Sequence, residues 1–564
     1  MRDNLCDRLE TVYVGLALAG GAAGVWACGE PEAMAAWAAS RGLTLLRPLT
    51  YPLPVALAED VAGALRRRLA GWGEPSRAVR QLAVLAREEL RRRGLPWRFR
   101  TEEVGVPGEG LPPPEVRKAV REALTGRRLL AGEVLRFCQW AGPLFPEAVS
   151  RALTFLRLAG EVGSEAAVAR DPDGQWRCRR CGSTRIQPAP CANCGDQACP
   201  LCADCLLLGE ARACRRLYFL PDRRLRPTLG AREGCEKGGW TFTAAQRRAA
   251  EALLDWLYDP GAPSEALLWA VCGAGKTLVA RPVVERALSA GWRVLYASPR
   301  RQVVRQVSAD LPRRGLILAT THQVLRYEGA FDLIVLDEPD AYPYRGNRLL
   351  EAGMRRAARA EARWLYLTAT PEPELVARVE AGAVRRVLLP ERFHGHPVPV
   401  PSLLTPGTAG ERSAGRQGIE ALAAEVISAR MAEGPRRFLV FTPTVALCHR
   451  TRAQLARRLP GPVGSVDAGS PTREETITAF QRGELPVLVS TTILERGVTF
   501  PAVDVVVLHA DHPLFDRVSL LQMAGRAGRA AVDPAGRVWY VAEGVSPEMA
   551  AARAWAQALN EAAG

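Results

Sequence analysis

Lysine is almost missing from this chain of 564 residues. Of its 75 basic residues only three are lysine, namely Lys118, Lys237 and Lys276. The bias that favoured arginine elsewhere still left Lys276 in a glycine-rich turn, where a phosphate-binding lysine belongs. Chance placement is a poor explanation for that lysine, so the turn becomes a candidate nucleotide site.

Long uninterrupted apolar segments are also missing. The run from 12 to 28 has no charged residue, but it contains four glycines and is barely long enough to cross a bilayer. The residues before it mix acidic and basic side chains, whereas a signal peptide begins with a positive flank. We therefore expect no stable membrane span or targeting segment here, and predict a buried strand or helix.

The 14 cysteines are not spread evenly, as core residues or disulfides would be, because eight of them lie between positions 178 and 214. Dense CxxC pairs in a large chain indicate a metal site in a reducing cytosol. Histidine is absent from this segment, which argues against an open catalytic site and favours a closed structural one.

Size and charge set the remaining limits. A chain of this length is too long for one core, so several domains are expected. Its net charge of +15 and pI of about 9.5 suggest a polyanionic partner such as nucleic acid, although basic surfaces can also serve solubility alone.

Short β-branched runs alternate with amphipathic helical patterns from about residue 240 onward. Examples are FDLIVLDE at 331–338 and RFLVFTPT at 437–444, and a Pro/Gly-rich stretch at 396–416 separates two such series. The alternation predicts two doubly wound parallel sheets in tandem, an α/β fold.

The segment AVCGAGKT at 270–277 lies between a predicted strand and a predicted helix. A loop there directs backbone N–H groups at a phosphate chain, next to the positive end of the helix dipole. Lys276 is expected to reach the β- and γ-phosphates of a nucleotide, and Thr277 to ligate magnesium. The nucleotide-binding residues predicted in this loop are Gly273, Ala274, Gly275, Lys276 and Thr277.

An apolar strand with an acidic end follows about sixty residues later. In FDLIVLDEPD at 331–340, Asp337 is expected to hold magnesium and Glu338 to orient and deprotonate the attacking water. An acidic turn after a strand is common, but its pairing with Lys276 makes a nucleotide-hydrolysing site the better interpretation.

Another motif, QMAGRAGR, carries two arginines and lies at 522–529. Arg526 and Arg529 are three residues apart and share one face if the segment is helical. Across an interdomain cleft they would act as arginine fingers, worth a factor of about 10³–10⁵ in rate. A solvated basic helix is the alternative, and Gln522 with the two glycines favours the nucleotide site.

Candidate contacts with a nucleic-acid backbone occupy the ends of predicted strands. They belong to SPRR at 298–301, TTHQ at 320–323 and STTILERG at 490–497, and TAT at 368–370 is the expected link between ATP state and domain closure. The residues predicted to contact phosphates are Pro299, Arg300, Thr321, Thr491 and Thr492.

Together these motifs resemble those of superfamily 2 DEAD/DEAH-type helicases, and among them the ComFA family. The resemblance covers about residues 175–560 and rests on a set of motifs and a CxxC segment upstream of them: WAVCGAGKT (269–277), TTHQVLRY (320–327), DEPDAYPY (337–344), TTILERGVT (491–499) and QMAGRAGR (522–529). Ala270 replaces the usual first glycine of the phosphate loop, and Pro339 and Tyr342 depart from the family's DEVDAFPY.

The resemblance implies two RecA-like domains and a cytosolic, membrane-peripheral ATPase that uses ATP and Mg²⁺. It implies that Gln246 reads the adenine edge, and that the protein binds single-stranded DNA and helps to power its import in natural transformation. A membrane DNA channel and other competence proteins are the implied partners.

The resemblance also implies how the cysteines are shared. Four thiolates suffice for one tetrahedral zinc ion, so eight can hold two. The family's zinc site corresponds to Cys178, Cys181, Cys202 and Cys205. A second ion would then take Cys191, Cys194, Cys199 and Cys214 in a cross-braced arrangement, while a sequential division is equally buildable.

The predicted architecture is therefore α/β, with two tandem RecA-like doubly wound domains behind a zinc-binding module and a mainly helical N-terminal region. The expected parts are residues 1–170, of unknown role; 171–235, the zinc-binding module; 236–395, the ATP-binding domain; 396–420, a linker; and 421–564, the helicase C-terminal domain.

Three functions fit these patterns. The first is a single-stranded DNA translocase of natural transformation, and the second is a replication-restart or repair helicase of the primosomal type. The third is a zinc-dependent nucleic-acid-binding protein with an ATP switch and no translocation. ATP turnover with and without single-stranded DNA separates the third from the others, and unwinding of a forked duplex separates the second from the first.

Overall fold

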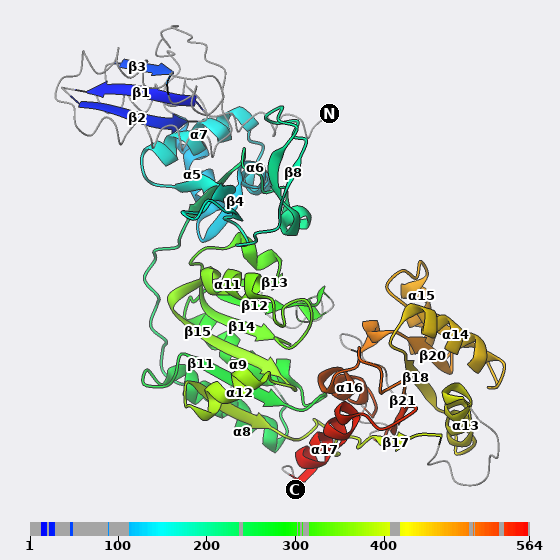
Figure 1. The fold of residues 1–564 in the computed structure, drawn as a ribbon. Helices are drawn as coiled ribbons and strands as arrows, with labels where there is room; N and C mark the ends of the chain where they lie inside the picture. The colour runs from blue at the N-terminus through cyan, green and yellow to red at the C-terminus, as the bar shows by residue number, and fades with distance from the viewer. Residues whose placement is uncertain are drawn as a thin grey trace. The chain divides into compact units, whose positions relative to one another are not determined.

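The computed structural model describes residues 13–19, 22–28, 45–48, 88, 112–235, 241–301, 303–304, 307, 315–406, 418–495, 500, 502–528 and 535–561 (Figure 1). Contacts divide the chain into two compact units. The first holds residues up to Arg226 together with segments 321–332 and 346–361, and the second holds 227–320, 333–345 and everything from Ala362 onward. Among the described residues, no helix combines the length and apolar character needed to cross a bilayer.

The apolar run near the N-terminus forms an antiparallel hairpin. Strands β1 (Tyr13–Ala19) and β2 (Ala22–Cys28) pair from Tyr13↔Cys28 to Ala19↔Ala22, and β3 (Leu45–Pro48) pairs with the other edge of β1. The composition predicted a mainly helical N-terminal region, and its described part mixes strands with helices.

A small α/β domain follows, and two of its three helices, α5 and α7, begin with proline at a first helical position, where no N–H is needed. Its sheet has the order β4-β10-β5, and β10 comes from beyond the cysteines. The predicted boundary at 170/171 therefore lies inside one folded domain. Its elements are α5 (Pro114–Leu124), β4 (Arg127–Leu130), α6 (Ala131–Ala141), α7 (Pro146–Leu158), β5 (Gly163–Ala166) and β10 (Arg216–Leu220).

The cysteine segment is built from two short hairpins between β5 and β10. In one, β6 (Val168–Arg170) pairs with β7 (Trp176–Cys178). In the other, β8 (Ile186–Ala189) pairs with β9 (Cys199–Cys202), and the 3₁₀ helix η2 (Ala203–Leu208) follows. Each hairpin carries cysteines at or next to its strand ends, which brings distant CxxC pairs together.

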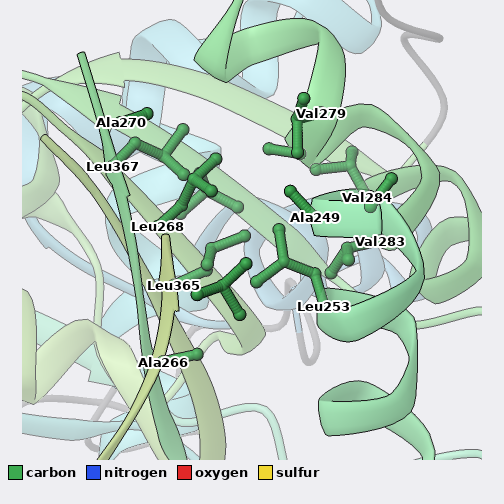
Figure 2. Packing of buried hydrophobic residues seen from close by; sticks show 14 of the residues in the cluster. Ala249, Leu253, Ala266, Leu268, Ala270, Val279, Val283, Val284, Leu365 and Leu367 are labelled. Carbon is green, nitrogen blue, oxygen red and sulfur yellow. The ribbon is translucent and has the colours of Figure 1, made fainter. Parts of the chain in front are cut away.

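The first large sheet has the order β13-β12-β14-β15-β11-β16. Strand β11 runs parallel to β15 and β16, and all seven residues of β14 are buried, as expected for a strand covered on both faces. Leu253 of α8 and Val283 of α9 pack on Leu268 and Leu365 (Figure 2). The elements are α8 (Ala244–Tyr258), β11 (Glu265–Ala270), α9 (Lys276–Ser289), β12 (Val294–Ser298), β13 (Leu316–Thr320), η4 (Gln323–Arg326), β14 (Phe331–Asp337), α11 (Arg348–Ala357), β15 (Ala358–Thr368), α12 (Pro373–Glu380) and β16 (Val384–Leu389).

The second large sheet has the order β17-β22-β21-β18-β20-β19, and its strands are parallel. Its edge strand β17 (Ser402–Leu404) lies within the predicted linker 396–420, so part of that linker belongs to the sheet. The other elements are α13 (Ile419–Ala432), β18 (Arg437–Phe441), α14 (Val445–Ala456), β19 (Val463–Val466), α15 (Arg473–Arg482), β20 (Val487–Ser490), η5 (Thr492–Leu494), β21 (Val503–Leu508), α16 (Arg517–Ala524), β22 (Val538–Val541) and α17 (Pro547–Glu561). The structure thus has the two RecA-like parallel-sheet domains that the sequence predicts.

Candidate functional site: a nucleotide site with two cysteine groups

The loop after β11 has the shape of a phosphate cradle. Gly273 and Gly275 both have φ of 84°, a region that glycine enters at little cost, and Gly275 is the residue before α9. Lys276 and Thr277 begin that 14-residue helix, so its N-terminal N–H groups and positive dipole end face the loop. A lysine, a hydroxyl and these N–H groups fit the phosphates of a nucleotide.

Gln246 is fastened to this loop. Its side-chain Oε1 accepts a hydrogen bond from the N–H of Thr243 at 3.0 Å, and its Nε2 donates to the carbonyl of Ala274 at 2.8 Å. A Cβ added at Gly275 would lie 2.8 Å from the same Nε2, so glycine permits this close approach. The structure thus brings Gln246 to the phosphate loop, while its contact with adenine stays a prediction.

The acidic motif ends strand β14 next to the loop. Asp337 is only 4% exposed, and its Oδ2 accepts a hydrogen bond from the hydroxyl of Tyr296 at 2.7 Å. Burial and the charge of Glu338 raise the pKa of Asp337 to about 6, and the charge of Lys276 opposes that shift. A divalent cation would relieve this unfavourable burial, so the carboxylate fits the predicted magnesium site. Sequence reasoning missed Tyr296, which lies in a plain apolar strand.

Hydrogen bonds join the acidic motif to the second RecA-like domain. The two RecA-like domains are called the first and second lobes below. The carboxylate of Asp340 accepts from the hydroxyls of Thr368 and Thr370, each at 2.6 Å. Gln522 of α16 donates to the Thr370 oxygen at 3.1 Å and accepts from the thiol of Cys272 at 3.4 Å. An unbroken chain of contacts thus runs from Asp340 to Cys272 in the phosphate loop. The sequence indicated TAT and Gln522 but missed Asp340 and Cys272.

The arginine motif departs from its prediction. Helix α16 ends at Ala524, and Arg526 lies in the turn that follows and not on the helix itself. Gly525 follows the helix with φ of −63° and ψ of −3°. Arg526 is 2% exposed and its Nε donates to the carbonyl of Glu495 at 2.8 Å. Arg529 lies outside the described residues.

A buried arginine that sequence reasoning missed also touches both lobes. Arg392 follows β16, and its Nε and Nη2 donate to the carbonyls of Cys272 at 3.3 Å and Ala527 at 2.7 Å. It belongs to none of the motifs, so only the fold reveals it. Together with Gln522 it ties the turn that carries Arg526 to the phosphate loop.

Gly525→Ala is expected to lower ATP turnover by about tenfold. Its new Cβ would lie 2.5 Å from the Cβ of Cys272, and relieving such overpacking costs about 1–3 kcal/mol. Steady-state turnover measures the loss, and Gly544→Ala is the matched control because no atom lies within 4 Å of its added Cβ. Turnover of Gly525→Ala equal to that of Gly544→Ala would contradict this contact.

The predicted phosphate contacts differ in their surroundings. Pro299 and Arg300 follow β12, and Thr491 and Thr492 follow β20, at the carboxyl ends of strands where ligands of parallel sheets bind. Arg300 pairs with Glu495 at 2.9 Å. Thr321 follows β13 and its side chain is only 1% exposed, so a contact of this residue with a phosphate stays a prediction.

The eight cysteines gather in two groups of four. Within each group all sulfur atoms lie within 4.8 Å of one another, and the groups are Cys178, Cys181, Cys202 and Cys205, and Cys191, Cys194, Cys199 and Cys214. This is the cross-braced division and not the sequential one. Sulfur separations of 3.8, 3.6 and 3.6 Å match the roughly 3.8 Å expected around a tetrahedral zinc with 2.3 Å bonds. Both groups therefore suit a closed structural zinc site.

Comparisons with known proteins identify the family of this chain. Residues 114–219 match the family model of the competence protein ComFA N-terminal domain, and residues 418–531 match that of the helicase conserved C-terminal domain. The first match begins well before residue 175, where the sequence motifs placed the start of the resemblance. It covers much of the small α/β domain that sequence reasoning left without a role.

Two curated relatives span most of this chain. The competence protein ComFA of Streptococcus pneumoniae is 31% identical over 427 residues, which are 72% of this chain and 95% of the relative. Its Bacillus subtilis counterpart is 31% identical over 411 residues, 69% of this chain and 86% of the relative. Among solved structures, the Mycobacterium smegmatis helicase Lhr bound to ssDNA and AMP-PNP is 20% identical with a TM-score of 0.40, covering 53% of this chain and 46% of that one.

Proposed function

This chain belongs to the ComFA family of competence-associated superfamily 2 helicases, and we propose that it is an ATP-driven translocase of single-stranded DNA that helps to power DNA import in natural transformation. One observation carries the proposal: hydrogen bonds run from Asp340 through Thr370 and Gln522 to the phosphate loop. A path of this kind is what a motor needs to turn the state of its nucleotide into movement of a lobe.

Each polar group of the site has a proposed task. Lys276 and the first turn of α9 would hold the phosphates, and Thr277 and Asp337 would hold magnesium. Bound MgATP supplies the free energy of hydrolysis. Glu338 would orient the attacking water and take up its proton, and Arg526 or Arg529 would neutralise charge that develops on the phosphoryl group.

Movement would follow from changes at the acidic motif. Asp340 holds both threonines of TAT, so a shift of the motif after phosphate release would move Thr370 and with it Gln522. Because interfaces are packed and bistable, such small shifts can become movements of a whole lobe. Residues at the strand ends, among them Pro299, Arg300 and Thr491, would grip successive phosphates of the DNA.

The remaining assignments are also proposals. Both cysteine groups would bind zinc and stabilise their hairpins. The protein would act on the cytoplasmic side of the membrane, where a DNA channel and other competence proteins would be its partners.

ATP turnover in the presence of single-stranded DNA, duplex DNA and RNA tests the proposal. We expect single-stranded DNA to stimulate turnover more than the other two. Equal rates with and without nucleic acid would overturn it in favour of a binding protein with an ATP switch, and efficient unwinding of a forked duplex would favour a repair or restart helicase.

DNA affinity is expected to fall steeply with salt, because phosphate contacts release counterions and the net charge is +15. Contacts with about five phosphates of a single strand give a log–log slope of about −3.5, or roughly a hundredfold loss between 50 and 200 mM salt. Fluorescence anisotropy with a labelled oligonucleotide measures the slope. A flat response would contradict tracking along the backbone.

A further inference from the structure

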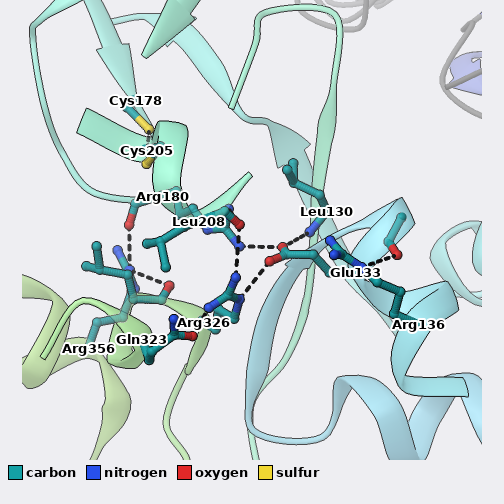
Figure 3. A network of polar contacts seen from close by, with 12 residues as sticks. Leu130, Glu133, Arg136, Cys178, Arg180, Cys205, Leu208, Gln323, Arg326 and Arg356 are labelled. Carbon is teal, nitrogen blue, oxygen red and sulfur yellow. Dashed lines mark hydrogen bonds and ion pairs between the residues drawn. The ribbon is translucent and has the colours of Figure 1, made fainter. Parts of the chain in front are cut away.

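The carboxylate of Glu133 lies at the centre of a polar network in the first unit (Figure 3). It belongs to the first turn of α6 and is 3% exposed. Its Oε2 accepts from the N–H of Leu130 at 2.9 Å and is paired with Arg180, while its Oε1 accepts from Nε of Arg326 at 2.7 Å. One buried carboxylate thus holds arginines from two distant parts of the sequence.

The first of these arginines lies within the first cysteine group, which is made of Cys178, Cys181, Cys202 and Cys205 and is called the knuckle below. Arg180 stands between Cys178 and Cys181 and is wholly buried. Its Nη1 donates to the carbonyl of Leu208, the last residue of the 3₁₀ helix η2 that carries Cys205. Both halves of the first cysteine group are therefore connected to Glu133 through Arg180.

The second arginine belongs to the segment that carries a predicted nucleic-acid contact. Arg326 ends η4, five residues after Thr321, and contacts the side chain of Gln323 in the same TTHQVLRY motif. Its Nη2 also donates to the carbonyl of Leu208 at 3.0 Å. One guanidinium therefore joins this motif both to Glu133 and to the knuckle.

A second pair of contacts supports the same connection. Arg356 of α11 donates from Nη2 to the carbonyl of Arg180 at 2.6 Å and to that of Leu325 at 3.4 Å. Arg128 of β4 pairs with Glu328 at 2.6 Å. Arg356 therefore bridges the knuckle and segment 321–328, and Arg128 fastens the same segment to the sheet of the small α/β domain.

Metal binding fixes the shape of this network. A knuckle of this size owes its order to its ion, so loss of the ion would free Arg180 and the Leu208 carbonyl. A buried polar network that is only partly satisfied is costly, so Glu133 and Arg326 would rearrange in turn. The position of segment 321–328 therefore depends on the state of the cysteine group.

We infer that the metal held by Cys178, Cys181, Cys202 and Cys205 positions segment 321–328 through Glu133 and Arg326, and so sets how tightly this segment engages single-stranded DNA. Arg326 is a positioning residue in this scheme. The inference rests on the proposed function, and it adds a task for the metal beyond holding its own hairpins.

Arg326→Gln tests the inference. This substitution removes the charged contact to Glu133. The side chain of Arg326 is 19% exposed, so a change there is less damaging than a change at wholly buried Arg180. We expect the single-stranded DNA concentration for half-maximal stimulation to rise about tenfold, the effect of losing about 1.4 kcal/mol of DNA-binding free energy. Zinc content and DNA-free ATP turnover should stay within about twofold of the parent chain.

A merely structural role is separated by a reciprocal measurement. Coupling between two sites acts in both directions, so bound oligonucleotide should slow amide hydrogen exchange in residues 176–183 of the parent. The protection should vanish in Arg326→Gln and return in part in Arg326→Lys, which keeps the charge.

Arg121→Gln is the matched control, because it breaks a 2.6 Å ion pair with Glu161 in the same unit but outside the network. A parent stimulated by DNA whose Arg326→Gln variant behaves like this control would overturn the inference alone. If single-stranded DNA does not change the ATP turnover of the parent chain, both the proposed function and the inference are overturned.

Discussion

Lys276→Ala is expected to lower ATP turnover by at least about 10²-fold, the usual loss when one charge-stabilising donor leaves a reacting centre. Lys276 begins α9 at the end of the phosphate loop, so its ammonium group would reach the position where phosphate charge develops. DNA binding should stay largely intact, because the predicted backbone contacts lie elsewhere. Steady-state phosphate release and oligonucleotide anisotropy measure the two effects separately.

The scarcity of lysine provides a clean control for this experiment. Lys118 is an exposed residue of α5, and Lys118→Ala removes the same charge from the chain. Its turnover should match that of the parent. Equal turnover of Lys276→Ala and Lys118→Ala would remove the assigned nucleotide site.

Replacing Cys178 and Cys181 by serine is expected to remove one zinc ion per chain and to destabilise the first unit strongly. Structural zinc contributes about 10–16 kcal/mol of binding free energy in small knuckles, part of which stabilises the fold. A net loss of only about 3 kcal/mol would lower the unfolding midpoint of a unit of this size by about 6–12 °C. Metal analysis and thermal unfolding measure both effects.

Cys138→Ser is the matched control for that pair. Cys138 is buried in α6 of the same unit and belongs to neither metal group. It should keep both ions and lose much less stability. A variant at Cys178 and Cys181 with unchanged zinc content would refute their assignment as ligands.

A combined variant distinguishes the two divisions of the cysteines. In the structure, Cys178 and Cys181 belong to one group and Cys191 and Cys194 to the other. Replacing all four by serine should therefore remove both ions. In a sequential division these four residues would share one ion, and the other would remain bound.

Local sequence was enough to propose the nucleotide site, which stays a prediction. The loop before Lys276 and the acidic end of the strand before Asp337 each depend on a strand and the residues directly after it. Hydrophobic periodicity places such strands, and glycines and charged residues mark the loops at their ends. The two RecA-like sheets were predicted for the same reason, since each strand and helix is recognisable from its own residues.

Contacts between distant residues could not be predicted in this way. Arg326 and Glu133 are 193 positions apart, and Arg392 and Ala527 are 135 apart. Nothing near Glu133 distinguishes it from any other first-turn glutamate of a helix. The break of α16 before Arg526 escaped for a related reason, because a glycine can continue a helix or end it and the tertiary contacts decide.

The way strand β10 enters its sheet has a consequence for how this domain is assembled and inherited. The chain leaves the sheet at Ala166, builds both cysteine hairpins, and returns so that Arg216 lies directly opposite Ala166. The hairpins are thus a detour whose two ends meet, while the returning strand occupies the middle of the sheet. On a ribosome the sheet can close only after both knuckles have emerged, and inherited insertions or deletions in the detour must leave its two ends able to meet.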